Sequence, residues 1–396
     1  MDSTNSRTLF SLQFLLLCLS SFLFFASFNM IIPELPDYLE NLGGGEYKGL
    51  IISVFTITAG LSRPFSGKLA DTIGRIPVMI FGAVVCFLVG FLYPVLGSVS
   101  AFMLLRLVHG FSTGFKPTGT AAYVADVVPN ERRGEAMGVL GIAGSLGMAS
   151  GPAIGSEIAM RFSMETMFYT SSFCALLSVI VLAGMKETLK KRVKFSFRLL
   201  RIHPAEVLEP RVFAPSALMM LTAFPFGIIL TLIPDLSVHL GFENKGTFFT
   251  ALTLSSVLIR FFAGKASDKF GRVAVLKIST ISLAISLVAV AFAGSKETFL
   301  LAAVFTGIAF GMNTPTIFAW TVDLSDPDFR GRAMSTMFIA LEIGIGFGAL
   351  ISGWVYSNNV ANLPVSFLLG SVTSFMAFLY IQFYYKPKKY LKNENT

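Results

Sequence analysis

Long apolar segments recur from one end of the chain to the other. A helix needs about 20 mostly apolar residues to cross the hydrocarbon core of a bilayer, and twelve segments meet this requirement. They run roughly from 9 to 32, 49 to 70, 77 to 96, 101 to 124, 134 to 158, 167 to 185, 213 to 236, 247 to 266, 274 to 293, 299 to 322, 333 to 356 and 365 to 385. The sequence therefore predicts an all-α membrane protein with twelve transmembrane helices.

The composition agrees with lipid as the solvent of these segments. The 396 residues are 54% hydrophobic and only 14% charged, whereas ordinary globular chains are roughly a quarter charged. The net charge of +8 comes from short basic clusters between apolar segments, which is a topology signal rather than a nucleic-acid patch. Cys18, Cys86 and Cys174 lie inside apolar segments without metal-ligand spacing. We expect no metal site, no cofactor and no nucleic-acid partner.

One long polar connection, from Lys186 to Arg211, divides the chain. We predict an N-terminal six-helix bundle at 1–185, a cytoplasmic linker at 186–211 and a C-terminal six-helix bundle at 212–396. Cytoplasmic loops carry an excess of Lys and Arg, and the 31 basic residues are distributed unevenly. Four are placed on the opposite side and two inside the membrane, which leaves 31 − 4 − 2 = 25 near one face. We therefore predict a multi-pass protein of the cytoplasmic (inner) membrane, with both termini in the cytoplasm.

The two halves carry the same motifs at a fixed offset. The segment 63–75 returns as 260–272, with Asp71 repeated as Asp268, so the offset is 268 − 71 = 197. Asp126 returns at the same offset as Asp323. Several matches at one offset are typical of transporters built from structural repeats. We therefore predict that the two bundles are related by pseudo-two-fold symmetry.

The duplicated motif resembles that of a known family. Gly67-Lys-Leu-Ala-Asp71-Thr-Ile-Gly74-Arg75 is similar to the loop signature between the second and third helices of the major facilitator superfamily. The resemblance covers essentially the whole chain, and together with motifs in the fourth and fifth helices it points to the drug/proton antiporter branch with twelve spans. It implies two six-helix bundles around a central cavity that opens alternately to each side.

The resemblance also implies a conformational latch on the cytoplasmic side. Asp71 would face the positively polarised N-terminus of the eleventh helix, near Arg330, and Arg75 would pair with Asp126, as Arg272 would with Asp323. The alternative is a plain basic loop with a glycine turn. The latch residues are Gly67, Asp71, Gly74, Arg75, Asp126, Asp268, Arg272 and Asp323.

Small residues mark the fifth helix. Gly147, Gly151 and Gly155 recur at four-residue spacing, which bares one face for close helix packing, and Pro152 should bend the helix. This pattern resembles the antiporter signature and favours export, although helix packing alone also explains it.

The fourth helix contains Arg106 and His109, similar to a further family motif in which a Gln is usual where His109 stands. Because His titrates near neutral pH, His109 is either a neutral replacement or part of a proton path. For Arg106 we favour structural pairing with backbone or a carboxylate over ion coupling.

Lys116 in the fourth helix and Glu342 in the eleventh are the deepest charges by count. A charge near the bilayer centre costs at least about 2.5–3.5 kcal/mol and is by default a functional-site hypothesis. Lys116 aligns with Asn313, since 116 + 197 = 313, and this polar pair fits a substrate site; the alternative is a Lys neutralised by a local carboxylate. Glu342 is expected to carry the coupling proton or hold a cationic group, with a salt bridge to Lys116 as the structural alternative.

Polar residues also gather at the outer end of the first helix, where Glu34 and Asp37 follow Asn29 by one to two turns. They are expected at an outer gate, or simply in water.

Enzyme chemistry has little support, because the chain has three His and no HExxH, Gly-x-Ser-x-Gly or Walker motif. We expect a monomeric secondary transporter that exports small amphipathic or drug-like molecules in exchange for protons. The alternatives are an importer or uniporter of a small metabolite, with Lys116 anchoring an anionic group, and a membrane sensor or scaffold that no longer transports.

Overall fold

The chain folds into helices throughout the part that the structure describes. A computed structural model describes residues 11–128, 133–202, 207–325 and 330–384. The long helices of the first half are α1 (Leu12–Met30), α3 (Lys48–Thr72), α4 (Arg75–Leu92), α5 (Val99–Val127), α6 (Arg133–Arg161) and α7 (Met164–Ala183), with a short α2 (Leu35–Asn41). Those of the second half are α8 (Phe213–His239), α9 (Thr247–Phe270), α10 (Arg272–Ala291), α11 (Lys296–Leu324), α12 (Arg330–Tyr356) and α13 (Leu363–Leu379).

Equivalent residues begin and end equivalent helices in the two halves. Ser98 caps α5 by accepting a hydrogen bond from the backbone of Ala101, and Ser295, 197 positions later, caps α11 in the same way. Gly74 and Gly271, also 197 apart, have φ of +129° and +90° and form the turns that separate α3 from α4 and α9 from α10. The repeat seen in the sequence is therefore a repeat of local structure.

Ten of the described helices are long and apolar enough to cross a membrane, or eleven if the bent α9 is one span. Helix α9 bends by 47° between its segments 247–260 and 262–270. Helix α5 falls short because Arg106, His109 and Lys116 lower the mean hydropathy of its 29 residues. The all-helical membrane fold is as predicted.

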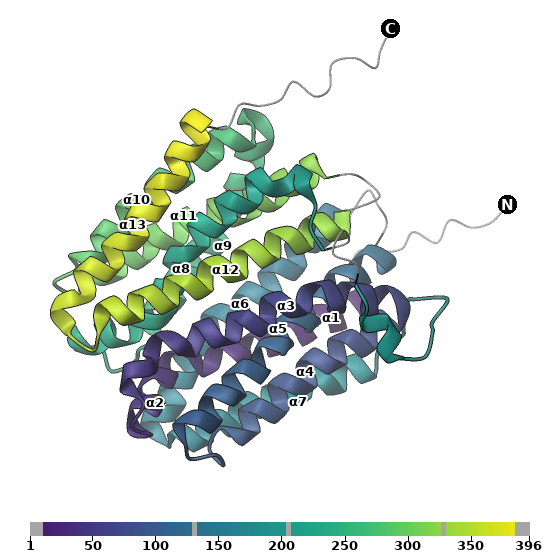
Figure 1. Cartoon of the computed structure of the whole chain (residues 1–396), viewed down its shortest axis with the longest axis horizontal. Coiled ribbons are helices and arrows are strands. Elements are labelled where there is room, and N and C mark those ends of the chain that lie inside the picture. The colour runs from purple at the N-terminus through teal and green to yellow at the C-terminus, as the bar shows by residue number, and fades with distance from the viewer. Residues whose placement is uncertain (1–10, 129–132, 203–206, 326–329, 385–396) are drawn as a thin grey trace, which may run out of the picture.

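Helices α1 and α3–α7 pack against one another, and so do α8–α13 (Figure 1). The two groups meet where α3 lies beside α12 and where α6 lies beside α9. One end of the molecule, which we call the linker end, holds the start of α1, the end of α13 and the segment between α7 and α8 (Figure 1). Helix α2 lies at the opposite end, which we call the α2 end (Figure 1).

Residues 186–202 and 207–212 run over the linker end and are fastened to both groups. Glu187 accepts hydrogen bonds from the backbone N–H groups of Arg75 and Ile76 at the start of α4. Glu209 is buried, accepts from Arg332 of α12 and has its backbone bonded to Thr336. The segment is therefore part of the packed structure rather than a loose tether.

Candidate functional site

The two groups of helices touch backbone to backbone at the α2 end. A Cβ atom added at Gly353 of α12 would lie 2.5 Å from the Cα of Gly49 in α3. At the other crossing, a Cβ added at Gly246 would lie 2.3 Å from the backbone of Pro152 in α6. Only glycine permits such approaches, so the α2 end is closed in this conformation.

Two lysines tie the groups together at this end. The Nζ of Lys48 in α3 lies 2.8 Å from Asp235 of α8 and 2.9 Å from Glu40 of α2. The Nζ of Lys245, just before α9, lies 3.0 Å from Glu34 and also pairs with Asp37. Glu34 and Asp37, expected at a gate or in water, therefore form interbundle contacts.

The surroundings of Lys245 keep it charged. Burial alone would lower the pKa of Lys245, but the carboxylates of Glu34 and Asp37 outweigh burial and hold the pKa above its ordinary value of 10.5. Ser156 of α6 donates a 2.6 Å hydrogen bond to Glu34. Sequence reasoning placed these lysines on the far side but missed their pairing; the available signal was the offset, since 48 + 197 = 245.

An ion pair joins the two groups halfway along α3 and α12. The Nη2 of Arg63 lies 3.1 Å from Oε1 of Glu342, and both side chains are buried. A Cβ added at Gly60 would lie 3.3 Å from the Cβ of Glu342, so the glycine lets α12 bring its carboxylate close to α3. The guanidinium also lies 4.4 Å from the ring centroid of Phe338, a cation–π contact. Phe338 precedes Glu342 by one turn of α12.

This pair leaves donors unused. The Nε and Nη1 of Arg63 are buried and have no hydrogen-bond partner among the described residues. A buried guanidinium is strongly disfavoured when its donors are left unpaired. Arg63 can therefore donate hydrogen bonds to a further acceptor without giving up its pair with Glu342.

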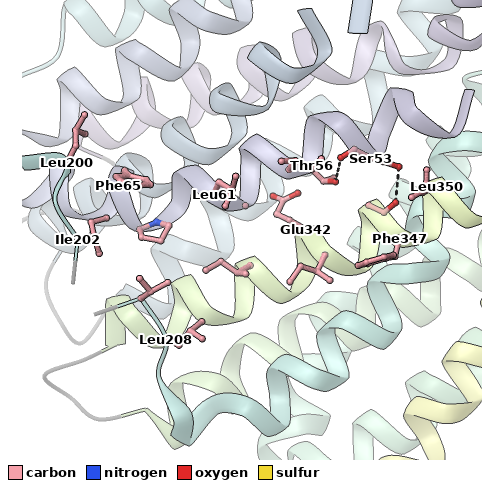
Figure 2. Close-up of a pocket in the computed structure, with 17 residues that line it drawn as sticks. Ser53, Thr56, Leu61, Phe65, Leu200, Ile202, Leu208, Glu342, Phe347 and Leu350 are labelled. Carbon is pink, nitrogen blue, oxygen red and sulfur yellow. Dashed lines mark hydrogen bonds between the residues drawn. The ribbon is translucent and has the colours of Figure 1, made fainter. Parts of the chain in front are cut away.

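A cavity of about 820 Å³ opens beside this pair (Figure 2). Glu342 points into it from α12, and Leu61 and Phe65 of α3 face it from the opposite wall (Figure 2). The remaining wall is apolar apart from Ser53 and Thr56, and Ser53 donates a 2.9 Å hydrogen bond to the carbonyl of Gly346.

The cavity reaches the linker end and the side of the molecule. Leu200, Ile202, Val207 and Leu208 from the segment between α7 and α8 complete its wall. Leu61 of α3 is two-thirds exposed. The cavity thus lies alongside the contact between α3 and α12 and is closed toward the linker end by residues of the connecting segment.

The salt bridge between Lys116 and Glu342, which was the structural alternative for Glu342, does not form in this conformation. Glu342 pairs with Arg63, while Lys116 is fully buried inside the first bundle and donates a 2.8 Å hydrogen bond to Ser21. Helix α4 covers Lys116, because a Cβ added at Gly82 would lie 2.6 Å from its backbone N. The sequence shows how deep in the membrane each charged residue lies, but it does not show toward which neighbouring helix its side chain points.

Lys116 and Asn313 are not brought together at a common cavity. Asn313 is buried in the second bundle and accepts a 3.1 Å hydrogen bond from Ser279 of α10. The repeat places the two residues at equivalent positions, but each is enclosed by its own helices. A local carboxylate on Lys116 is likewise not found among the described contacts, where Ser21 is its hydrogen-bond partner.

Arg106 makes the structural contacts that we favoured. Its Nε donates a 2.8 Å hydrogen bond to the carbonyl of Ile51, and its Nη1 lies 3.4 Å from the hydroxyl of Tyr93. His109 lies 3.3 Å from the same hydroxyl through Nδ1 and 3.4 Å from Cys86 through Nε2. Both side chains are fully buried, so they connect α3, α4 and α5 rather than facing the cavity.

Asn29 also has a local contact. Its Nδ2 donates a 2.8 Å hydrogen bond to the carbonyl of Phe25 one turn earlier in α1.

The loop aspartates pair within their own halves. Arg75 lies 3.1 Å from Asp126 and 2.6 Å from Asp71. The side chain of Asp71 is 72% exposed, so it is directed to solvent in this conformation. The side chains at 330–331, where the eleventh span begins, lie outside the described residues.

The second copy repeats this arrangement, with Arg272 2.9 Å from Asp323 and paired with Asp268. A Cβ added at Gly67 would meet nothing within 4 Å. The two arginine pairs are as expected, while the role of the latch across the bundles stays a prediction.

The glycines of the fifth span pack on α1. Added Cβ atoms at Gly147, Gly151 and Gly155 would lie 2.5, 2.6 and 2.0 Å from backbone oxygens of α1. Pro152 lies inside α6, at the contact with the segment before α9. The bare face of this helix thus allows close packing within the first bundle, and its proline faces the second.

The sequence matches a known family and known transport proteins. The Major Facilitator Superfamily model matches residues 17–243 and 216–396, so the chain belongs to the major facilitator superfamily and is a secondary transporter. It is 25% identical over 364 residues to the quinolone resistance protein NorA of Staphylococcus aureus, covering 90% of this chain and 93% of that protein. It is 33% identical over 265 residues to the multi-drug resistance efflux pump PmrA of Streptococcus pneumoniae, covering 63% of this chain and 66% of that protein.

Solved structures share the fold. The human organic anion transporter MFSD10 superposes with a TM-score of 0.74 at 21% identity, over 93% of this chain and 99% of that one. A D-xylose-proton symporter superposes with a TM-score of 0.77 at 18% identity, over 95% and 98% of the two chains. These likenesses concern the fold; membership of the family makes the chain a multi-pass membrane protein with a small-molecule substrate.

Proposed function

We propose that this transporter exports small amphipathic molecules in exchange for protons, and that Glu342 is the residue on which the proton binds. The observation that carries the proposal is the placement of Glu342: it lies halfway along α12, faces the cavity, and forms the ion pair with Arg63 that joins the two bundles. The same carboxylate thus lines the cavity and forms part of the interface between the two halves.

Proton binding to Glu342 would change the cavity and the interface between the halves at the same time. A proton added to a carboxylate oxygen of Glu342 removes the negative charge that holds Arg63, and a neutral acid gives a much weaker interaction with a buried guanidinium. Helix α12 is then free to separate from α3 at this level. Loss of the proton restores the ion pair, so the protonation state selects between two packings of the halves.

The distribution of charge supports an orientation with both termini in the cytoplasm. Arg63 and Arg260 lie within α3 and α9 and are therefore removed from the count of basic residues near the cytoplasmic face. Without the six basic residues outside the described ranges, 31 − 4 − 4 − 6 = 17 lie near the linker end, with Lys48, Arg161, Lys245 and Lys296 opposite. The excess remains large, so the linker end is cytoplasmic and the closed α2 end faces outward.

The direction of transport rests on the relatives. The matching proteins of S. aureus and S. pneumoniae are named for quinolone resistance and multi-drug efflux, and the first spans nearly the whole chain. The apolar wall of the cavity, with one carboxylate in it, suits an amphipathic solute with a cationic or hydrogen-bonding group.

Glu342→Gln tests the proposal because it keeps the shape and removes the charge. In proteoliposomes loaded with a pH-sensitive dye, proton-driven transport of ethidium should be lost while ethidium exchange at zero gradient survives. Glu297→Gln, an exposed carboxylate at the start of α11, is the matched control and should transport normally. Retention of both activities in Glu342→Gln, with an unchanged pH profile, would exclude Glu342. Ethidium flux that ignores the proton gradient in the wild-type protein would instead indicate a uniporter.

A further inference from the structure

The two crossings between the bundles are equivalent by sequence but not by chemistry. Adding 197 to Arg63 of α3 gives Arg260 of α9, and subtracting 197 from Glu342 of α12 gives Ser145 of α6. Subtracting 197 from Phe338 gives Gly141. At one crossing Arg63 therefore faces a glutamate and a phenyl ring. At the other crossing, the positions equivalent to these two residues hold a serine and a glycine.

The equivalence of α6 and α12 holds in space as well as in sequence. Gly147 packs against the carbonyl of Phe22 in α1, and its counterpart Gly344 packs against the carbonyl of Met220 in α8. Gly147 follows Ser145, and Gly344 follows Glu342, by two residues. The residues facing Arg63 and Arg260 can therefore be compared position by position.

Arg260 makes a contact across its crossing that corresponds to the Arg63 contact. Its Nη1 lies 3.1 Å from the hydroxyl of Ser145. Ser145 cannot neutralise the guanidinium, and no carboxylate pairs with Arg260 among the described ion pairs. Its Nε is buried without a hydrogen-bond partner in the described part of the chain. Leaving this Nε–H without an acceptor is costly, because a polar group withdrawn from solvent loses its hydrogen bonds to water.

There is space for such an acceptor next to Arg260. A Cβ added at Gly141 would meet nothing within 4 Å, and the same is true of Gly138 one turn further and of Gly264 on α9. Helices α6 and α9 are in contact from Pro152 and Gly246 to Ser145 and Arg260, and Gly141 lies one turn before Ser145 on the same face of α6. The open side of Arg260 is thus on the face where the first crossing carries Phe338.

We propose that Arg260 is the anchor of a binding site for aromatic carboxylates. The carboxylate of the ligand would occupy the place that Glu342 fills beside Arg63, and its ring would occupy the place of Phe338 above the guanidinium. Ser145 supplies a further hydrogen bond to the carboxylate. This inference goes beyond the proposed export function: it adds a second site, for an anionic class of ligand, at the α6–α9 crossing.

Binding to purified protein tests the site directly. Biphenyl-4-carboxylate should bind the detergent-purified wild-type protein in calorimetry, and biphenyl-4-carboxamide, which lacks the charge, should bind at least about tenfold more weakly. Arg260→Gln should weaken carboxylate binding by a similar factor. Ser145→Glu recreates the internal carboxylate of the other crossing, so it should also abolish binding while raising the melting temperature. Ser145→Gln fills the same space without charge and is the control that separates charge from volume.

The outcomes are distinct. Failure of the wild-type protein to bind the carboxylate at millimolar concentration, or equal affinity in the wild-type, Arg260→Gln and Ser145→Glu proteins, would overturn the site. Equal loss in Ser145→Glu and Ser145→Gln, with Arg260→Gln unaffected, would overturn it too, because volume alone would be responsible. Proton-driven ethidium transport is measured separately. If it persists while carboxylate binding fails, this inference fails alone; if it is absent while binding follows the variants, the proposed export function fails and the site stands.

Discussion

The closed α2 end should open when Lys245 loses its charge. Lys245→Gln leaves the buried carboxylate of Glu34 without a cation, and breaking a buried pair costs about 3–5 kcal/mol. Part of this cost is avoided here, because Glu34 keeps its hydrogen bond from Ser156 and the side chain of Asp37 is 42% exposed. We therefore expect a loss of about 2 kcal/mol of closed-state stability, which raises the ratio of open to closed molecules about 30-fold.

Thiol labelling measures this ratio. In a background without the native cysteines, a cysteine at Ala149, which is buried and whose carbonyl accepts a hydrogen bond from Thr250, should react with an impermeant maleimide only when the α2 end opens. Lys245→Gln should raise the labelling rate, whereas Lys296→Gln, an exposed lysine at the same end, should leave it unchanged. A rate within twofold of the parent in a folded Lys245→Gln protein would refute the role of this ion pair.

Three further predictions concern other contacts. Arg63→Gln alone should lower the melting temperature because it leaves Glu342 buried and unpaired, and the double variant with Glu342→Gln should recover part of the loss; strict additivity in this double-mutant cycle would contradict the pair. Because the pKa of Lys245 is raised above 10.5, its stabilisation is fully present below that value and is lost only as pH rises beyond it. The labelling rate, divided at each pH by the rate of a solvent-exposed cysteine to remove the effect of thiolate formation, should therefore not change between pH 7 and 9; an increase in this ratio would show that Lys245 deprotonates earlier. Gly155→Ala should destabilise the protein by several kcal/mol, since its Cβ would lie 2.0 Å from a carbonyl of α1, whereas Gly138→Ala meets open space; equal melting temperatures would contradict this packing.

Much of the fold follows from the sequence, because lipid imposes a strong and local requirement. Each spanning helix must be long and apolar, and the repeat at 197 residues relates the two halves without any structure. The pairs of Arg75 with Asp126 and of Arg272 with Asp323 were also predictable. Their residues belong to short motifs next to helix ends, where few neighbours compete.

The interbundle contacts could not be predicted in the same way. Lys116 and Glu342 share a similar depth, but which face of a helix meets the other bundle depends on packing that periodicity does not resolve. Arg63 lies in the predicted span 49–70, two turns before Asp71, but it was counted with the cytoplasmic charge rather than among the intramembrane residues. For this reason Lys116, and not Arg63, was considered as a partner for Glu342.

The segment between α7 and α8 has a consequence for chimeric and split transporters. Four of its apolar residues, Leu200, Ile202, Val207 and Leu208, belong to the cavity wall together with α3 and α12. A cut or domain exchange at residue 190 and one at residue 210 would leave the same helices but assign this wall to different parents. Substrate range in such hybrids should therefore follow the origin of the connecting segment as well as that of the helices.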